Sequence, residues 1–317
     1  MQPTKPSISV ADIERWLDRS GHPPSRLEPL AGDVSARRYL RAESSGRSLI
    51  VAVYPPTLRA TCERFVATGD LLREAGLRVP SVVESDCRLG AMLLEDLGEL
   101  TLYDLRSEPW SVLRPHLEQA VDDAGRIGEL DPGAVAALSP PLDEPLLARE
   151  LEQTWQSFLS PRGLGGGRRS TAELRAALAE LCGRLGEAPR VPCHRDYMAR
   201  NLVPLTDGRL GLLDHQDLRL GPPFYDLASL FNDSLFPPAT LTGELLGTVA
   251  DELGYHRAAA QRALKAVGTF ATFAERGDPR HLGLIPQTLG RAREHLLLIP
   301  ETAGIVGHLA ARWRSVC

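Results

Sequence analysis

The amino-acid sequence predicts an α+β fold in which a small, β-rich N-terminal lobe (residues 1–98) precedes a larger helical lobe (residues 99–317). Three observations predict this organisation. Short runs of strand-forming residues, separated by turn signals, fill much of the first hundred positions. Apolar residues recur at helical spacing through most of the remaining chain. Between them, the character of the sequence changes at Glu95-Asp-Leu-Gly98, which we interpret as a hinge.

The first lobe is predicted to contain a five-stranded antiparallel sheet. Ser9 is a suitable N-cap for a preceding helix over Val10–Arg19, and a second helix near Leu58–Glu74 ends before Gly76. The turn Glu43-Ser-Ser-Gly46 joins the second and third strands as a hairpin. The strands are expected at Arg26–Leu30, Ala36–Arg41, Leu49–Val53, Ser81–Glu84 and Ala91–Leu94.

The second lobe is predicted to be almost entirely helical, apart from a conspicuous polar tract and a small hairpin across Asp207-Gly208. The Gly-rich segment Ser160–Ser170 suits either a flexible surface loop or a phosphate-binding loop, and we favour the surface loop because no strand precedes it. Amphipathic helices are expected at Pro109–Gly128, Glu144–Leu159, Thr171–Leu185, Leu241–Leu253, His256–Glu275, Pro279–Leu297 and Glu301–Ser315.

Composition narrows the class of protein. A net charge of −5 and a pI near 5.9 argue against nucleic-acid binding, which usually requires a basic surface. The chain has no secretory signal and no apolar run of the roughly 20 residues that span a bilayer, so we expect a cytoplasmic protein without membrane contact. Its five cysteines are scattered and are expected to be reduced, with Cys193 packed in the interior. The oligomeric state is not predicted.

The polar tract is Val191-Pro-Cys-His-Arg-Asp-Tyr-Met-Ala-Arg-Asn-Leu202, followed by Leu212-Leu-Asp-His-Gln-Asp217. Asp196, Asn201 and Asp214 have the separations expected of a catalytic loop for phosphoryl transfer and its metal-binding aspartate. Alone, Asp196 would suit a helix cap or turn equally well. With the other two, it is the candidate base for an attacking hydroxyl, while the oxygen ligands Asn201 and Asp214 suit Mg²⁺ bound to the phosphates of ATP.

The sheet is expected to supply groups that contact those phosphates. Gly32 permits a tight turn after the first strand, and Ser35 lies within phosphate reach of that turn. The third strand, Ser48–Tyr54, contains no lysine that could contact the phosphates. Arg37 and Arg38 are the candidate replacements, and only one of them can face the phosphates because neighbouring residues on a strand point to opposite faces. Whether Glu63 or Glu74 acts as a partner is left open.

The residues that bind the phosphoryl acceptor are harder to identify. Glu150 and Trp155 suit hydrogen bonding to a sugar and stacking on it, but an amphipathic helix that buries Trp155 explains the same pattern. His194 and Asp226 are expected to hold the tract in place. Four further acceptor-site candidates are Arg200, Asp217, Asn232 and Asp233.

These residues resemble the aminoglycoside phosphotransferase superfamily, whose members are small-molecule kinases with a protein-kinase-like, two-lobe fold. The resemblance covers nearly the whole chain through GDVSARRY, MLLEDLG, HRDYMARN, DHQD and GPPFYDLASL. Within the superfamily the chain looks most like bacterial anomeric kinases of N-acetylmuramate and N-acetylglucosamine. The resemblance implies ATP and Mg²⁺ as cofactors, a sugar substrate phosphorylated at its anomeric hydroxyl, and adenine contacts from the backbone of Glu95 to Leu97.

Two other kinds of function are compatible with the sequence. A kinase of another hydroxyl compound, such as glucose, glucosamine, an aminoglycoside, choline or homoserine, would use the same catalytic residues. A non-catalytic, kinase-shaped scaffold would explain the missing strand lysine. The presence of Asp196, Asn201 and Asp214 together argues against the scaffold, which has no chemical need for all three.

Overall fold

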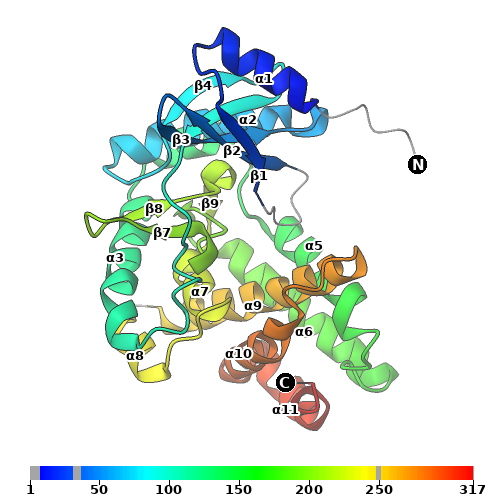
Figure 1. Ribbon diagram of the computed structural model, residues 1–317. Coiled ribbons are helices and arrows are strands. Elements are labelled where there is room, and N and C mark those ends of the chain that lie inside the picture. The colour runs from blue at the N-terminus through cyan, green and yellow to red at the C-terminus, as the bar shows by residue number, and fades with distance from the viewer. Residues whose placement is uncertain (1–7, 31–36, 248–250, 317) are drawn as a thin grey trace. The chain divides into compact units, whose positions relative to one another are not determined.

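A computed structural model describes residues 8–30, 37–247 and 251–316, which form two compact units (Figure 1). The first unit runs up to Glu99 and also includes Val203–Asp217. The second comprises Leu100–Leu202 and the chain from Leu218 onwards. None of the described helices is long and apolar enough to cross a membrane.

The first unit is built on the predicted five-stranded antiparallel sheet, in the order β1-β2-β3-β5-β4 (Figure 1). Consecutive residues of β3 are buried or half-buried from Leu49 to Val53, because alternate side chains pack apolar groups on opposite faces of the sheet. Ser45 and Gly46 both have positive φ and form the predicted hairpin turn between β2 and β3. The strands are β1 (Arg26–Pro29), β2 (Arg38–Ser44), β3 (Arg47–Val53), β4 (Val82–Asp86) and β5 (Ala91–Glu95).

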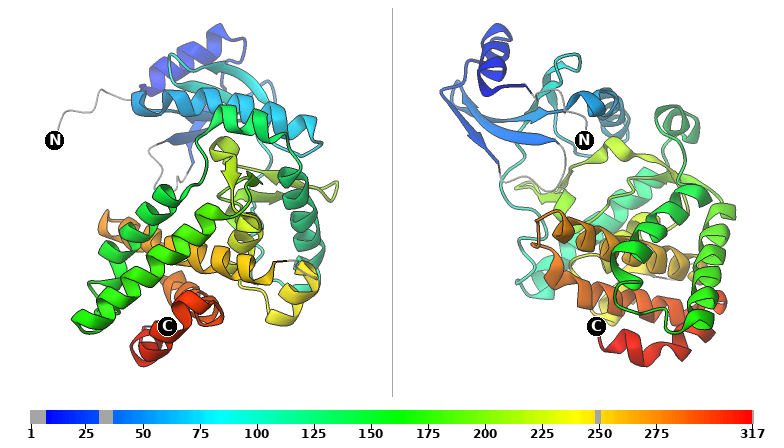
Figure 2. Two further views of the ribbon diagram at one scale, coloured as in Figure 1. Left: turned by 180° about the vertical axis from the view of Figure 1, so that it is seen from behind. Right: turned by 90° about the vertical axis from the view of Figure 1, so that its right-hand side faces the viewer.

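One helix packs on each face of this sheet (Figure 2). Helix α1 (Val10–Arg19) buries Ile13, Trp16 and Leu17 against alternate strand residues, and Ser9 and Asp12 form a capping box at its start. Helix α2 (Arg59–Glu74) packs Cys62 and Phe65 against the other face. Alternate residues of the strands therefore pack into two separate hydrophobic cores, one on each face of the sheet.

The hairpin in Val203–Asp217 belongs to the first unit although it follows the helical part of the sequence. Its strands are β7 (Leu202–Pro204) and β8 (Leu210–Leu212), and the predicted turn at Asp207-Gly208 joins them. The Leu212 amide donates to the Arg78 carbonyl at 2.7 Å. Gly211 allows a close approach here, because a Cβ would lie 2.5 Å from the end of the Leu97 side chain, which would have to move. The hairpin is thereby fixed beside the chain that follows α2.

The second unit is helical and is organised around α9 (Glu252–Glu275), which packs against α5, α7 and α10. At Gly268 a Cβ would lie 2.2 Å from Thr154 Oγ1, so α9 and α5 approach backbone to backbone. The remaining elements are α3 (Trp110–Gly128), α4 (Pro132–Leu138), α5 (Glu144–Thr154), α6 (Arg168–Glu187), β6 (Val191–Cys193), β9 (Arg219–Gly221), α7 (Tyr225–Asn232), α8 (Ala239–Leu246), α10 (Ile285–Leu298), α11 (Pro300–His308) and α12 (Ala310–Arg314).

Several predicted helix boundaries differ in the structure. The helix expected to reach Leu253 ends at Leu246, and α9 begins at Glu252 because the Asp251 side chain accepts a hydrogen bond from the Gly254 amide. The helix expected over Glu144–Leu159 continues past Thr154 as a π-helical turn. The Gly-rich segment 160–170 lies mostly at the surface, as predicted, but Leu164 is buried and its carbonyl accepts from the Trp313 indole at 3.2 Å.

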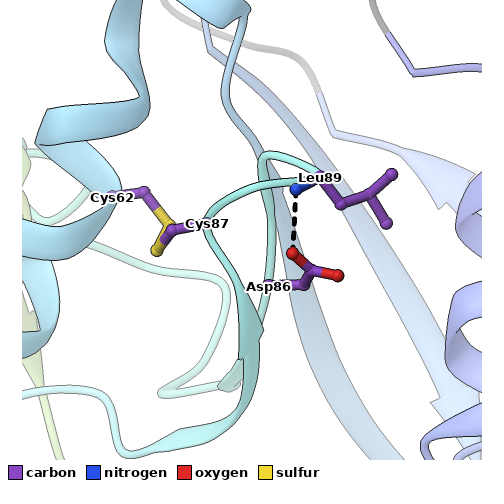
Figure 3. Close-up of a disulfide and its surroundings, with 4 residues drawn as sticks. All are labelled: Cys62, Asp86, Cys87 and Leu89. Carbon is purple, nitrogen blue, oxygen red and sulfur yellow. Dashed lines mark hydrogen bonds between the residues drawn. A yellow bond between two sulfur atoms is a disulfide. The ribbon is translucent and has the colours of Figure 1, made fainter.

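The prediction of five reduced cysteines was wrong. Cys62 on α2 and Cys87, which follows β4, form a disulfide with a Cα–Cα separation of 5.7 Å (Figure 3). Asp86 accepts a hydrogen bond from the Leu89 amide and orders the same turn. Packing of α2 on the sheet brings together two cysteines that are 25 positions apart, which no sequence spacing reveals. Cys193 is buried, as expected of a packing residue.

Candidate active site

The polar tract begins with β6, and a buried carboxylate holds the residues that follow this strand. Asp226, in the first turn of α7, accepts hydrogen bonds from the amides of His194 at 2.6 Å and Arg195 at 2.9 Å. Burial raises the pKa of Asp226, although the two amides and His194 oppose this change. Arg195 has a φ of 75°, a rarely adopted conformation that these contacts stabilise. The expected structural role of Asp226 is therefore confirmed.

Asp196 lies between cationic side chains of α9. Its Oδ1 is 3.2 Å from Lys265 Nζ and 3.5 Å from Arg262 Nη2. Desolvation favours the neutral acid, but the charges of Lys265, Arg195 and Arg262 outweigh it and hold the pKa of Asp196 far below its usual range. The carboxylate is therefore ionised at neutral pH, and its side chain is 28% exposed. Such a group can orient a hydroxyl and accept its proton.

Glu150 on α5 is the second acidic member of this group. It accepts hydrogen bonds from Arg195 Nη2 at 2.9 Å and from Gln261 Nε2 at 3.0 Å, and lies 3.5 Å from Lys265 Nζ. Burial alone would raise the pKa of Glu150, but Lys265 and Arg195 lower it. We call Glu150, Arg195, Asp196, Arg262 and Lys265 the Asp196 cluster.

Two further predicted residues extend the cluster. Asp233 lies 3.5 Å from Arg262 Nη2 and accepts a hydrogen bond from Arg200 Nη2 at 2.7 Å. Asn232, its neighbour, is not part of the cluster: its amide donates to Tyr255 Oη and its Oδ1 contacts His295. Trp155 is also separate, being only 9% exposed in the helical core with Arg175 over its indole.

Asn201 contacts the polar tract through its side chain. Its Nδ2 donates to the Asp196 carbonyl at 2.8 Å, which leaves Oδ1 as the oxygen that could bind a cation. A hard cation such as Mg²⁺ prefers oxygen ligands of this kind. In the described parts of the chain, no three His, Cys, Asp or Glu side chains form a metal site by themselves.

Asp214 belongs to the first unit, where it follows β8 with a φ of 57°. Arg37, immediately before β2, reaches it with Nη2 3.2 Å from Asp214 Oδ2. Arg37 is 10% exposed beside Tyr39 and Tyr54, and burial raises the pKa of Tyr54 to about 12. The Asp214 side chain is 39% exposed, so its carboxylate remains accessible for a cation. Asp217 ends the short helical turn that follows.

Arg38 points the other way and donates to the Ile8 carbonyl. Arg37 is therefore the one of the two arginines that faces Asp214, and its contact with the phosphates stays a prediction. Gly32 and Ser35 lie outside the described residues. In the expected hinge, the Glu95 side chain binds Arg78 and the Ser81 amide. The Leu97 side chain packs against Gly211.

Four residues of this site were not predicted. Arg195 precedes Asp196 directly. Lys265 and Arg262 lie about 70 positions beyond Asp196, and the scarcity of lysine in the sequence distinguished Lys265. The fourth is His215, which follows Asp214: its Nδ1 lies 2.8 Å from Thr68 Oγ1 and its ring stacks on Phe65, both on α2. Gly69 leaves room for this ring, since a Cβ there would lie 3.3 Å from it.

Comparison with known proteins identifies the class to which this fold and site belong. The sequence matches the model of the phosphotransferase enzyme family over residues 26–262. Its structure is similar to choline kinase LicA from Streptococcus pneumoniae, with a TM-score of 0.63 at 16% identity over 93% of this chain and 98% of that one. It is also similar to ADP-bound aminoglycoside phosphotransferase APH(2'')-Ib, with a TM-score of 0.61 at 13% identity over 94% and 99%.

Curated relatives agree with this result. The chain is 34% identical to the N-acetylmuramate/N-acetylglucosamine kinase of Pseudomonas aeruginosa, over 91% of this chain and 89% of that protein. It is 32% identical to the Pseudomonas putida protein of the same name, over 97% of both. The protein belongs to the phosphotransferase enzyme family. The predicted kinase-like α+β fold and the resemblance to this group of sugar kinases are both confirmed.

Proposed function

We propose that the protein is an ATP-dependent kinase that phosphorylates the anomeric hydroxyl of N-acetylglucosamine or N-acetylmuramate to give a sugar 1-phosphate. The observation that supports phosphoryl transfer most directly is the ionised Asp196, held by Lys265 and Arg262. Support for the sugar comes from relatives that are named for these two substrates and match nearly the whole chain. Because the reaction consumes ATP, we place it in the cytoplasm.

Asp196 would act as the base in this reaction. The anomeric oxygen attacks the γ-phosphorus of ATP, the bond from that phosphorus to the bridging oxygen breaks, and ADP leaves. The hydroxyl proton passes to Asp196. A carboxylate with a low pKa is adequate because the transition state is loose and orientation supplies much of the effect. Asp226 keeps the loop backbone fixed while this happens.

The nucleotide would be bound mainly by residues of the N-terminal lobe (residues 1–98), and the sugar by the lobe that follows (residues 99–317). The backbone of Glu95 to Leu97 would contact adenine. Arg37 would contact the phosphates in place of the missing strand lysine, as its position beside Asp214 suggests. Gly32 and Ser35 would add backbone and hydroxyl donors.

Asn201 and Asp214 would hold Mg²⁺, since the first offers Oδ1 and the second an accessible carboxylate. When bound there, Mg²⁺ would supply positive charge that offsets the negative charge of the ATP phosphates. For the sugar, we propose Glu150, Arg200, Asp217 and Asp233 as the residues nearest the acceptor, with Trp155 and Asn232 the weaker candidates, since they contact other groups.

The test is ³¹P NMR of the purified protein with Mg-ATP and one acceptor at a time. N-acetylglucosamine or N-acetylmuramate should give a phosphate signal split by the sugar's H1 proton. Transfer only to glucose or glucosamine would show that the substrate is a sugar without the N-acetyl group. Transfer only to kanamycin, choline or homoserine would overturn the sugar assignment. No transfer to any acceptor, despite ATP binding, would favour the scaffold.

Asp196→Asn should lower kcat about 1,000-fold, within the range expected for loss of a general base, while ATP still binds. Asp207→Asn is the matched control, because Asp207 is an exposed hairpin residue that pairs only with Arg209 among the described residues. Equal activity of Asp196→Asn and the control would show that Asp196 is not the base.

A further inference from the structure

Lys265 occupies an unusual position for a lysine in this protein. The chain has only two lysines, Lys5 and Lys265. Lys265 is on α9, its side chain is 13% exposed, and its ammonium lies between two carboxylates: 3.2 Å from Asp196 Oδ1 and 3.5 Å from Glu150 Oε1. Burial of the ammonium lowers the pKa of Lys265. The negative charges of Asp196 and Glu150 act in the opposite direction but do not outweigh burial. A surface lysine would have none of these features.

The other cations of the cluster have partners of their own. Arg195 donates to Glu150, and Arg262 donates from Nε to Ser229 Oγ at 3.0 Å while its Nη2 also lies near Asp233. Arg200 is paired with Asp233. Arg262 is 3.5 Å from Asp196 Oδ1, so Lys265 is the nearer of the two cations to that oxygen. It also connects Asp196 to α5 through Glu150.

The two oxygens of Asp196 are consequently not equivalent. Lys265 and Arg262 both contact Oδ1. Among the described residues, the hydrogen bond to this carboxylate comes from Lys265 Nζ and ends on Oδ1, and none ends on Oδ2. A carboxylate bound at one oxygen is fixed in rotation, and its other oxygen is presented in a defined direction.

We propose that Lys265 is a positioning residue for phosphoryl transfer, which clamps Oδ1 of Asp196 against Glu150 so that Oδ2 takes the proton of the acceptor hydroxyl. This inference rests on the proposed function, because it requires Asp196 to be the base. A compact ammonium with three donors fits between two carboxylates, whereas the planar guanidinium of arginine requires a different arrangement of acceptors.

The kinetic test compares Lys265→Met, Lys265→Arg and the control Lys5→Met. If Lys265 positions the base, Lys265→Met should lower kcat about 100-fold, at the lower end of effects on general-base catalysis, with KM for Mg-ATP within about twofold of the wild type. Lys265→Arg should recover at least tenfold of that loss, because it restores the charge. A kcat for Lys265→Met within about threefold of the wild type and of Lys5→Met would overturn the proposal.

A second measurement does not depend on activity. With two lysines in the chain, ¹³C-lysine labelling gives two Cε signals, and Lys5→Arg identifies the one from Lys265. Asp196→Asn removes an opposing charge, so the Lys265 signal should titrate at lower pH than in the wild type, while the Lys5 signal stays unchanged. Identical Lys265 titrations in wild type and Asp196→Asn would rule out the contact.

The two measurements separate this inference from the proposed function. A wild-type protein that phosphorylates no N-acetyl sugar would refute the proposed substrate. If it phosphorylates another hydroxyl compound, the same kinetic comparison is made with that acceptor. If it transfers phosphate to no acceptor, the positioning role fails together with the function, even where the NMR coupling between Lys265 and Asp196 is present.

Discussion

Arg37 places a positive charge beside Asp214, where the third strand provides no lysine. The third strand has no lysine, and the arginine that precedes the neighbouring strand instead pairs with Asp214 at 3.2 Å. Register explains how: β2 begins at Arg38, opposite Val53, so Arg37 lies beside Tyr54 at the end of β3. A guanidinium at this point can pair with Asp214 or bind a phosphate bidentately.

Arg37→Ala should therefore weaken ATP binding much more than Arg38→Ala. We expect an increase of about tenfold in KM for Mg-ATP with Arg37→Ala, corresponding to roughly 1.4 kcal/mol for one charge-assisted contact. Arg38→Ala is the matched control because Arg38 binds the Ile8 carbonyl on the other side of the strand. Steady-state kinetics at varied ATP checks this, and equal effects of the two variants would contradict the assignment.

The sequence predicted the residues of the site that lie close together in the chain. Asp196, Asn201 and Asp214 were recognised because their separations are short and regular, although their roles remain predictions. Lys265 was not, because a helix about 70 positions further on brings it to Asp196. Trp155 was proposed because aromatic residues suit sugars, but the same periodicity that forms α5 directs its indole into the core.

At the scale of elements, α2 contacts the residue after Asp214 without using an acidic side chain. Thr68 and Phe65 contact His215, the residue after Asp214, and Gly69 allows the close approach. The question of whether Glu63 or Glu74 pairs with a strand lysine therefore does not arise in this protein. A hydrogen bond and a ring contact connect α2 to this segment instead.

The Cys62–Cys87 disulfide should stabilise the first unit. It closes a loop of 25 positions between α2 and the β4–β5 turn, and the chain-entropy model assigns roughly 3 kcal/mol to such a cross-link. Thiol titration of the denatured protein should find two fewer thiols without reductant than with it. The double variant Cys62→Ala/Cys87→Ala should melt at a lower temperature than the unreduced wild type. Equal thiol counts would show that the two sulfurs are not joined.

Element types were easier to predict than element ends. The five strands and the two helices that cover them follow from alternation, turn residues and caps, which are local signals. The ends in the second unit depend on tertiary packing and on single caps such as Asp251. Helix α4 was missed although Asp131 caps it and Pro132 begins it, because seven residues give too few turns for a recognisable period.

For the molecule as a whole, the division into units departs from the order of the sequence. The hairpin Val203–Asp217 is grouped with the sheet, so Asp214 belongs to the first unit and Asn201 to the second, although Asp214 is only thirteen positions further along the chain. No local pattern predicts this grouping. It arises from contacts such as the one between the Leu212 amide and the Arg78 carbonyl.

Global stability should depend on pH through a histidine pair in the second unit. His295 Nε2 contacts Asn232 Oδ1 at 3.0 Å, and its Nδ1 is 2.9 Å from His256 Nδ1. Asn232 Oδ1 can only accept, so Nε2 donates and the neutral ring accepts from His256. Burial, His256 and Arg291 lower the pKa of His295 to about 3, while burial lowers that of His256 against the opposing charge of Glu252.

Between pH 6.5 and about 3 the unfolded chain therefore binds more protons at His295 than the folded protein does. The free energy of unfolding should fall as pH decreases through this range, by up to roughly 1.4 kcal/mol per pH unit from this residue. Urea denaturation at several pH values should show a flatter dependence for His295→Asn than for the wild type. His308→Asn, at an exposed position on α11, is the control. Parallel pH profiles for all three proteins would show that His295 does not cause the pH dependence of the free energy of unfolding.

The absence of a lysine from β3 has a practical consequence for detecting this protein. Nucleotide probes that acylate a lysine beside the phosphates are used to enrich ATP-binding enzymes from cell extracts. On this chain the reagent would find no amine on that strand, and Lys265 is largely shielded between two carboxylates. Such surveys would overlook the protein at any abundance. Dicarbonyl reagents, which react with guanidinium groups, would be the appropriate choice for its arginine-rich site.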